Sequence, residues 1–212
     1  MEDFDIYEFD IDDLCSCMDK NVKEDIKNFE DLVDLQANLD RQVFLGDITY
    51  GIGSAIDHII RFWNQYDEMH EIPVERRLPI KIYIDSNGGS LTDALTIIDA
   101  IKLSKTPVWT IAIGCVYSGA FFSFICGDKR IAYPHASFLF HEGSTGSSGT
   151  AAQFRNYADF YGIQLKQLKE IVLKHTDITE EEYNKVKKDD VWYDVQSGIE
   201  KGFIDEVAEG LV

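Results

Sequence analysis

Short apolar runs with the character of strands alternate with longer amphipathic segments between residues 41 and 207. The runs Arg41–Ile48, Ile80–Ile84 and Pro107–Ile113 are each followed by a segment in which apolar residues recur every three or four positions. Strands that alternate with helices form βαβ units, whose crossover helices make neighbouring strands parallel. The pattern therefore predicts an α/β fold built from repeated βαβ units.

The remaining elements follow from turn and cap signals. Ser90, with Asp93 three residues later, marks a helix start, and so does Thr179 with Glu182. Gly202 suits the end of a last helix. We expect further elements at these ranges: helices from Ile52 to Tyr66, from Ser118, over Ala151–His175 and over Val195–Lys201; strands at Lys129–Ala132 and Ser137–Phe140; and loops at 71–79 and 143–150.

Charge is distributed unevenly along the chain. The net charge is −18, and residues 1–40 hold 14 acidic and 3 basic residues, a net charge of −11. We therefore expect an acidic tail or docking segment at 1–40 and one folded domain at 41–212. Such a charge repels nucleic acid phosphates, so a nucleic acid partner is not expected.

Several absent motifs narrow the function further. No stretch approaches the roughly 20 apolar residues of a membrane span, and the acidic start does not resemble a signal peptide. We therefore expect a cytoplasmic protein without a membrane partner. The four cysteines lack zinc-site spacing, so no metal is expected, and Cys115 and Cys126 should be buried thiols. No phosphate loop is present, so this chain should not hydrolyse ATP.

The turn Asn87-Gly88-Gly89-Ser90 joins a strand to a helix. Paired glycines let the backbone approach a ligand closely, and the free N–H groups at a helix start attract negative charge. The same dipeptide is also common in simple turns.

Ser118 follows a strand and begins an apolar helical segment. There its hydroxyl either caps the helix or lies near the positive end of the dipole as a nucleophile, with the Gly119 N–H available to an oxyanion. The G-x-S-x-G pattern is absent, since Val116 and Ala120 occupy the glycine positions.

His141 is the best candidate for a general base. It follows the strand ending at Phe140 and precedes a glycine-rich loop, and an imidazole titrates near neutral pH. A surface histidine at a strand end is the alternative. A carboxylate to orient the ring is not singled out by spacing, which leaves Asp177, Asp189, Asp190 and Asp194 as candidates.

The order of these motifs resembles the ClpP family, the proteolytic subunits of the Clp protease. The segments that carry the resemblance are FLGDI, YIDSNGGSLTDALTIIDAI, IAIGCVYSGAFFSFICGDKRIAYPHASFLFH, KHTDIT and DDVWYDVQSGIEKGFIDEV, and they cover about Arg41 to Val207. The resemblance implies the ClpP/crotonase-like α/β fold, with the long helix as the family's handle.

The resemblance also implies roles for single residues. The catalytic serine, histidine and aspartate fall on Ser118, His141 and Asp190, and the oxyanion donors are the N–H groups of Gly89 and Gly119. The residues implied for substrate binding are Gly88, Ser90, Glu142, Gly143 and Ser144.

The activity implied is hydrolysis of peptide bonds in protein substrates inside stacked homo-oligomeric rings. A separate AAA+ unfoldase would consume ATP, and this chain would hold no cofactor. Three positions depart from the common family pattern: Tyr117 replaces a small residue, Gly119 a methionine and Asn87 a proline. The acidic start and the stretch 67–78 also differ.

Three alternatives remain open at this level. In the first, the chain is a ClpP-like scaffold or regulatory subunit that assembles without cleaving. A crotonase-like enzyme would use the two backbone amides to hold a thioester enolate. A serine–lysine peptidase would not need His141.

Overall fold

The computed structural model describes residues 40–186 and 189–212. The acidic segment, with Cys15 and Cys17, lies outside the described residues apart from Asp40. The folded unit spans Arg41–Val212. Its sheet has the order β1-β2-β3-β4-β7, and all neighbours along this path are parallel. The strands are β1 (Gln42–Leu45), β2 (Ile80–Ser86), β3 (Val108–Tyr117), β4 (Lys129–Ala132), β5 (Ser137–Phe140), β6 (Val191–Tyr193) and β7 (Glu206–Val207).

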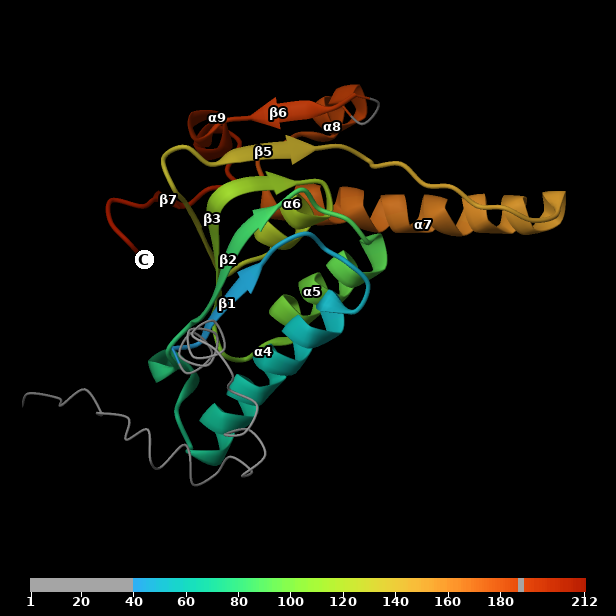
Figure 1. Ribbon diagram of the computed structural model, residues 1–212. Coiled ribbons are helices and arrows are strands. Elements are labelled where there is room, and N and C mark those ends of the chain that lie inside the picture. The colour runs from blue at the N-terminus through green and yellow to red at the C-terminus, as the bar shows by residue number, and fades with distance from the viewer. Residues whose placement is uncertain (1–39, 187–188) are drawn as a thin grey trace, which may run out of the picture. The chain divides into compact units, whose positions relative to one another are not determined.

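Helices connect these strands as the alternating pattern predicts. Figure 1 shows α4 and α5 side by side on one face of the sheet, and α7 extending outward as a long arm. The helices are α4 (Ile52–Met69), a 3₁₀ turn at Val74–Arg76, α5 (Leu91–Leu103), α6 (Gly119–Phe124), α7 (Ala151–His175), α8 (Glu180–Val186) and α9 (Val195–Glu200). The α/β fold with a long helix is therefore confirmed.

Strand β3 is longer than the sequence pattern predicts, and its extra residues matter for the site. Residues Trp109–Ala112 pair with β4, whereas Cys115–Tyr117 pair with β5. Gly114 lies between the two pairings, and a Cβ added there would come within 2.3 Å of the Asp85 carboxylate. Periodicity ended this strand at Ile113 because the second pairing depends on β5, more than 20 residues away.

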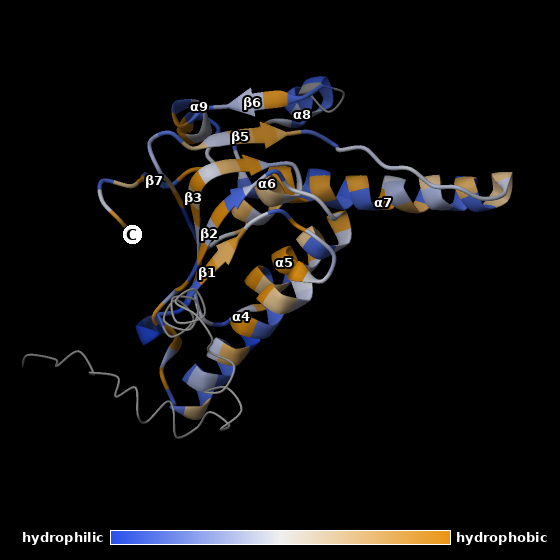
Figure 2. Ribbon diagram, viewed as in Figure 1, coloured by the Kyte–Doolittle hydropathy of each residue, from blue (hydrophilic) through white to orange (hydrophobic). Residues whose placement is uncertain are grey.

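The core is apolar and rich in aromatic rings on the side of β5. Figure 2 shows apolar residues along the strands and along α5 and α6. The Phe203 ring meets Phe121 and Phe138 at centroid distances of 5.2 Å, and all three are fully buried. Such packing gives α6 and β5 fixed positions, because close-packed interiors resist displacement of their side chains.

The caps set several helix ends where the sequence predicts them. The Ser90 hydroxyl accepts a hydrogen bond from the Asp93 N–H, and Thr179 does the same for Glu182. At the start of α7, Thr150 and Gln153 form a complete capping box. Gly202 follows α9 with φ 67°, a left-handed conformation that favours glycine.

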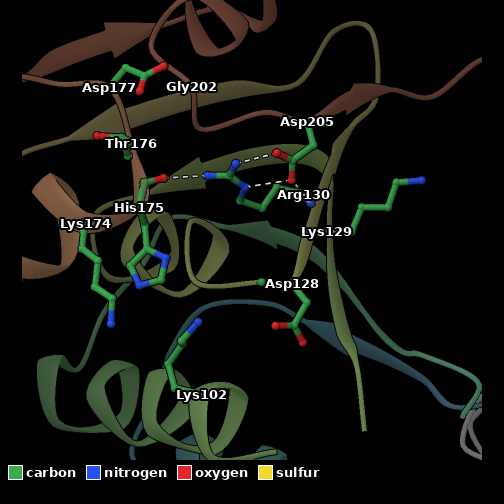
Figure 3. Close-up of a pocket in the computed structure, with 11 residues that line it drawn as sticks. Lys102, Asp128, Lys129, Arg130, Lys174, His175, Thr176, Asp177, Gly202 and Asp205 are labelled. Carbon is green, nitrogen blue, oxygen red and sulfur yellow. Dashed lines mark hydrogen bonds and ion pairs between the residues drawn. The ribbon is translucent and has the colours of Figure 1, made fainter. Parts of the chain in front are cut away.

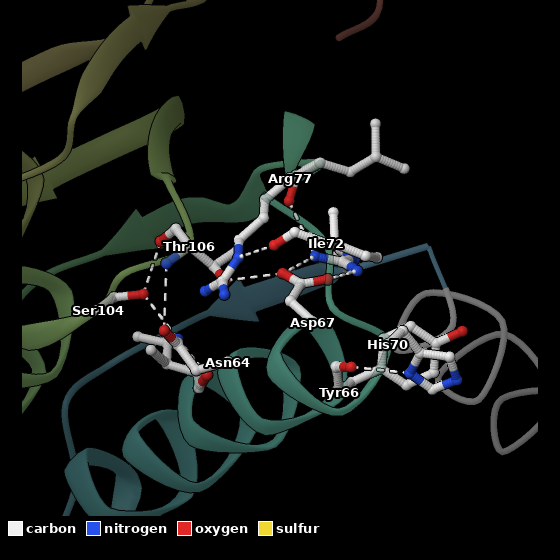
Figure 4. Close-up of polar contacts among 11 residues, drawn as sticks. Asn64, Tyr66, Asp67, His70, Ile72, Arg77, Ser104 and Thr106 are labelled. Carbon is white, nitrogen blue, oxygen red and sulfur yellow. Dashed lines mark hydrogen bonds and ion pairs between the residues drawn. The ribbon is translucent and has the colours of Figure 1, made fainter. Parts of the chain in front are cut away.

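A buried ion pair links the residue before β1 to helix α4. Arg41 donates two hydrogen bonds to Asp67 on α4, at 2.6 and 2.8 Å, and its guanidinium lies 4.4 Å from the Trp63 ring centroid. Figure 4 shows Asp67 among its polar neighbours, of which Thr106 donates to the same carboxylate. The chain entering β1 is thereby held against α4.

Two points differ from what the sequence predicts. Strands β6 and β7 were not predicted, because three-residue and two-residue strands lack periodicity and form only where a partner strand is present. Cys126 is fully buried as expected, but Cys115 is only half-buried beside Asp85.

Candidate active site

Ser118 occupies a strained turn between β3 and α6. Its backbone has φ 54° and ψ −121°, which is unusual for a residue with a side chain. The Ser118 N–H donates to the Leu139 carbonyl of β5 at 2.9 Å, and its carbonyl accepts from the Phe121 N–H. Its hydroxyl makes no capping bond to α6. The capping interpretation is therefore wrong, and the hydroxyl is left for another partner.

That partner is His141. The His141 Nε2 lies 2.7 Å from the Ser118 Oγ, and the Nδ1 lies 3.0 Å from Asp190 Oδ1. A carboxylate only accepts hydrogen bonds, so Nδ1 carries the proton toward Asp190. In the neutral ring Nε2 then accepts from the serine hydroxyl, which is the arrangement that polarises a serine for attack.

The pairing of β5 with β6 explains why Asp190, among the four candidates, meets His141. The two strands are antiparallel, and Phe140 stands opposite Val191. His141 follows β5 and Asp190 precedes β6, so the two side chains meet where the strands end. Asp194 instead caps α9 through Ser197, and Asp177 lies beside Gly202. The run Val191-Trp192-Tyr193, three residues of high strand propensity, was the available signal for β6.

Gly88 packs directly against the serine turn, and Gly89 packs against Ile48. Both have positive φ, 91° and 143°. A Cβ at Gly88 would come within 2.5 Å of the Tyr117 carbonyl oxygen, and one at Gly89 within 2.3 Å of the Ile48 carbonyl oxygen. The simple-turn interpretation therefore understates the constraint: only glycine lets the two turns approach this closely.

The N–H groups of Gly89 and Gly119 come from these two adjacent turns. A methyl group added at Gly119 would lie 3.7 Å from the Gly89 nitrogen. Gly119 is the first residue of α6, where backbone N–H groups have no partner within the helix. The two turns are thus in contact through Gly89 and Gly119, and the role of their N–H groups as oxyanion donors stays a prediction.

The residues predicted to bind substrate differ in exposure and in whether their polar groups are already hydrogen-bonded. Gly88 donates to Ser86 Oγ and accepts from the Ile48 N–H. The Ser90 hydroxyl is engaged with Asp93, so it supports α5. Gly143 and Ser144 are exposed in the loop after His141, and Gly143 has φ 77°.

Glu142 fixes the start of that loop. Its carbonyl accepts a hydrogen bond from the Tyr161 hydroxyl of α7 at 3.0 Å, and its carboxylate lies 3.4 Å from the Tyr183 hydroxyl of α8. Burial and the Glu142 carboxylate raise the pKa of Tyr183, which keeps the hydroxyl protonated as a donor. Neither tyrosine was identified from the sequence, because aromatic residues on amphipathic helices usually pack in the core.

The departures at 117 and 119 are both accommodated. The Tyr117 hydroxyl lies 2.8 Å from Ser137 Oγ, and its ring packs edge-on against Trp192. At Gly119, an added Cβ would approach Ala94 Cβ at 3.3 Å and Ile48 Cδ1 at 3.4 Å. A larger residue there would require these neighbours to shift, which accounts for glycine at this position.

Comparison with known proteins identifies the family. The family model described as Clp protease matches residues 71–210, which include Ser118, His141 and Asp190. The chain belongs to the Clp protease family. Among its relatives are three described as ATP-dependent Clp protease proteolytic subunits. Subunit 2 of Rhodococcus jostii is 32% identical over 130 residues, which cover 60% of this chain and 67% of the relative.

Two more Clp protease relatives give the same range of similarity. Subunit 2 of Corynebacterium diphtheriae is 33% identical over 132 residues, 61% of this chain and 66% of the relative. Subunit 1 of Streptomyces avermitilis is 33% identical over 139 residues, 65% of this chain and 64% of the relative. The alignments thus span about two thirds of each relative.

Two further findings concern the described residues alone. Within residues 40–186 and 189–212, no cluster of three or more histidine, cysteine, aspartate or glutamate side chains could hold a metal ion. In the same part of the chain, no helix has both the length and the apolar character needed to cross a membrane.

Proposed function

We propose that this chain is a serine endopeptidase that cleaves peptide bonds through Ser118, His141 and Asp190. The observation that carries the proposal is the continuous hydrogen-bonded line from the Ser118 hydroxyl through both ring nitrogens to the Asp190 carboxylate, at 2.7 and 3.0 Å. Membership of the Clp protease family supports the same chemistry. No cofactor enters this mechanism.

In the proposed reaction the Ser118 Oγ attacks the carbonyl carbon of the scissile peptide bond, while His141 Nε2 takes the hydroxyl proton. The Gly89 and Gly119 N–H groups stabilise the oxyanion that forms. The protonated ring then gives its proton to the leaving amine. A water molecule, activated by the same ring, hydrolyses the acyl-enzyme and restores Ser118. Asp190 keeps the proton on Nδ1 throughout.

Substrate binding belongs to the segment that follows His141. We propose that Glu142, Gly143 and Ser144 pair with an extended peptide as an added strand, and that Gly88 and Ser90 also contact the substrate. The exposure of Gly143 and Ser144 leaves their backbone groups free for such pairing. Tyr161 and Tyr183 hold the start of this segment through Glu142.

The assembly is part of the proposal. Rings of this chain would stack through α7 into a chamber in the cytoplasm, and a separate AAA+ unfoldase would use ATP to deliver protein substrates. The exposed apolar side chains on α7, which are Phe154, Phe160 and Ile163, support a contact between copies.

Labelling with a fluorophosphonate probe tests the chemistry directly. Reaction at Ser118, mapped by mass spectrometry, is expected for the unaltered protein and should be lost in Ser118→Ala and strongly reduced in His141→Ala. An assembled, folded protein that does not react would instead support the scaffold interpretation. Retained reactivity in His141→Ala would favour a serine–lysine mechanism.

A further inference from the structure

A polar hollow that does not include Ser118 lies where α5, β4 and the end of α7 meet. Its volume is about 510 Å³. Figure 3 shows that Lys102 and Lys174 extend toward the same space, with the His175 ring between them. The other side chains that contribute charge are Asp128, Lys129, Arg130, Asp177 and Asp205.

Two of the cations in this hollow, Lys102 and Lys174, have no ion-pair partner in the described part of the chain. Arg130 donates to Asp205 at 2.9 Å and to the His175 carbonyl at 2.6 Å, and Lys129 pairs with Glu206 at 2.6 Å. By contrast, no carboxylate among residues 40–186 and 189–212 lies within ion-pair distance of the Lys102 or Lys174 ammonium groups. A chain with a net charge of −18 contains many carboxylates that could have paired with these two lysines.

Three carboxylates line the hollow, those of Asp128, Asp177 and Asp205, and two of them are engaged in hydrogen bonds to other groups. Asp128 accepts a hydrogen bond from the Val108 N–H at 2.8 Å, and Asp205 is held by Arg130. Asp177 lies beside Gly202, in the upper part of Figure 3, away from the two ammonium groups. A ligand between the lysines would therefore be attracted at its centre and repelled if it extended far past them.

The pKa of His175 reflects the positive charge around its ring. Burial lowers its pKa, and the charged groups that lower it further are Lys102, Lys174 and Arg130. The lysines also lie in the last turns of α5 and α7, where cations favour the helix dipole. That explains each lysine singly, but it does not explain why both ammonium groups share one hollow without an ion-pair partner among the described residues.

We propose that this hollow binds a small, multiply charged phosphate anion between Lys102 and Lys174. Ammonium groups hold phosphate oxygens as point charges, and such bonds are stronger than neutral ones. The lining contains no aromatic ring other than His175, so nothing would stack on a nucleobase. The carboxylates of Asp128, Asp177 and Asp205 in the lining would repel an extended anion, so they favour a compact one such as pyrophosphate.

Calorimetric titration of the full chain with pyrophosphate tests this site, in buffer of constant ionic strength without divalent cations. The unaltered protein should bind one pyrophosphate per chain and melt at a higher temperature when it is present. In the double variant Lys102→Gln/Lys174→Gln, the association constant should fall at least tenfold. Each single variant should show an intermediate loss.

Lys166→Gln is the matched control, because Lys166 is an exposed lysine on the same helix, remote from the hollow. It removes one charge and should change the association constant less than twofold. Circular dichroism confirms that each variant is folded. An absence of pyrophosphate binding to the unaltered protein, or an equal loss in Lys166→Gln and the double variant, overturns the proposal. Neither result depends on the peptidase activity.

Discussion

Ser118 illustrates how a single residue acquires a role from backbone strain. A non-glycine residue with φ 54° is held by contacts on both sides, from the Leu139 carbonyl and from Gly88, which packs against the turn. Such strain persists only where the surrounding structure stabilises it, and it is concentrated at functional sites. Its consequence here is that the hydroxyl meets His141 instead of the helix.

Replacing Asp190 tests the third member of the proposed triad. In Asp190→Asn the amide can donate toward Nδ1, which favours the wrong ring tautomer for accepting the serine proton. We expect kcat for a peptide substrate to fall about 10³- to 10⁴-fold. Asp189→Asn is the matched control and should retain activity, since Asp190 and not Asp189 bonds the ring. Equal losses in the two variants would refute the assignment.

Gly88→Ala tests the packing of the two turns. The added methyl group would meet the Tyr117 carbonyl oxygen at 2.5 Å and the Ser118 Cβ at 2.8 Å, at a φ of 91°. We expect unfolding free energy to fall by about 2–4 kcal/mol and probe labelling to be lost. Gly146→Ala, where an added Cβ meets nothing within 4 Å, should change stability by less than about 0.5 kcal/mol. Denaturant titration of both variants measures the difference.

At the scale of elements, the site depends on pairings between segments far apart in the chain. Residues 109–112 of β3 pair with β4 and residues 115–117 with β5, and β6 forms because β5 offers it an edge. Helix α4 is also held by residues distant in the chain, because its Asp67 is fully buried against Arg41 and Thr106. Although burial raises the pKa of Asp67, its hydrogen bonds from Arg41 and Thr106 lower it further, so the net shift is downward.

Asp67→Asn therefore leaves the Arg41 guanidinium buried without a counter-charge. We expect a loss of about 3–5 kcal/mol in unfolding free energy, because removing one partner of a buried pair exposes the full cost of the other charge. Asp57→Asn, which breaks an exposed pair with Arg61 on the same helix, should cost less than about 1 kcal/mol. Thermal or chemical denaturation compares the two. A similar small loss in both would contradict the role given to Asp67.

At the scale of the whole molecule, α7 carries apolar side chains that no described residue covers. Phe154, Phe160 and Ile163 are each more than half exposed. We expect Phe160→Glu to shift the protein toward smaller assemblies in sedimentation velocity, because a charge would be buried between copies. Gln167→Glu adds the same charge to an exposed position on α7 and should leave the assembly unchanged. Unaltered sedimentation of Phe160→Glu would place the contact elsewhere.

The whole folded unit should also lose stability in acid. The pKa values of Asp67, Asp93, Asp194 and Asp205 are lowered, and hydrogen bonds from Lys201 and Thr179 lower that of Glu182 to about 2. A carboxyl with a lowered pKa contributes stability above its unfolded pKa, and that contribution is lost as pH falls through the folded value.

Unfolding free energy should therefore decrease as the pH falls from about 4.5 toward 2, with most of the change below pH 4. Denaturant titrations at constant, high ionic strength, which screens repulsion between like charges as the carboxylates titrate, measure the effect. Glu182→Gln should flatten the lower part of this profile. A profile independent of pH over this range would show that these carboxylates do not stabilise the fold.

The sequence by itself determined the alternation of strands and helices, the bounds of β4, β5 and α7, and the caps at Ser90, Thr179 and Gly202. These features depend on local propensity, periodicity and hydrogen bonds between residues close in the chain. It also singled out Ser118 and His141, since both follow apolar strands. From the residues alone, however, it left four aspartates open, and only the resemblance to a family selected Asp190.

Only the tertiary structure decided how those residues meet. The contacts of His141 with Ser118 and Asp190, and those of Glu142 with Tyr161 and Tyr183, join residues that are 19 to 49 positions apart in the chain. The hollow between Lys102 and Lys174 arises in the same way, from two helix ends 72 positions apart in the chain. Local patterns carry no information on such contacts, because the free energy that selects them comes from burying distant segments together.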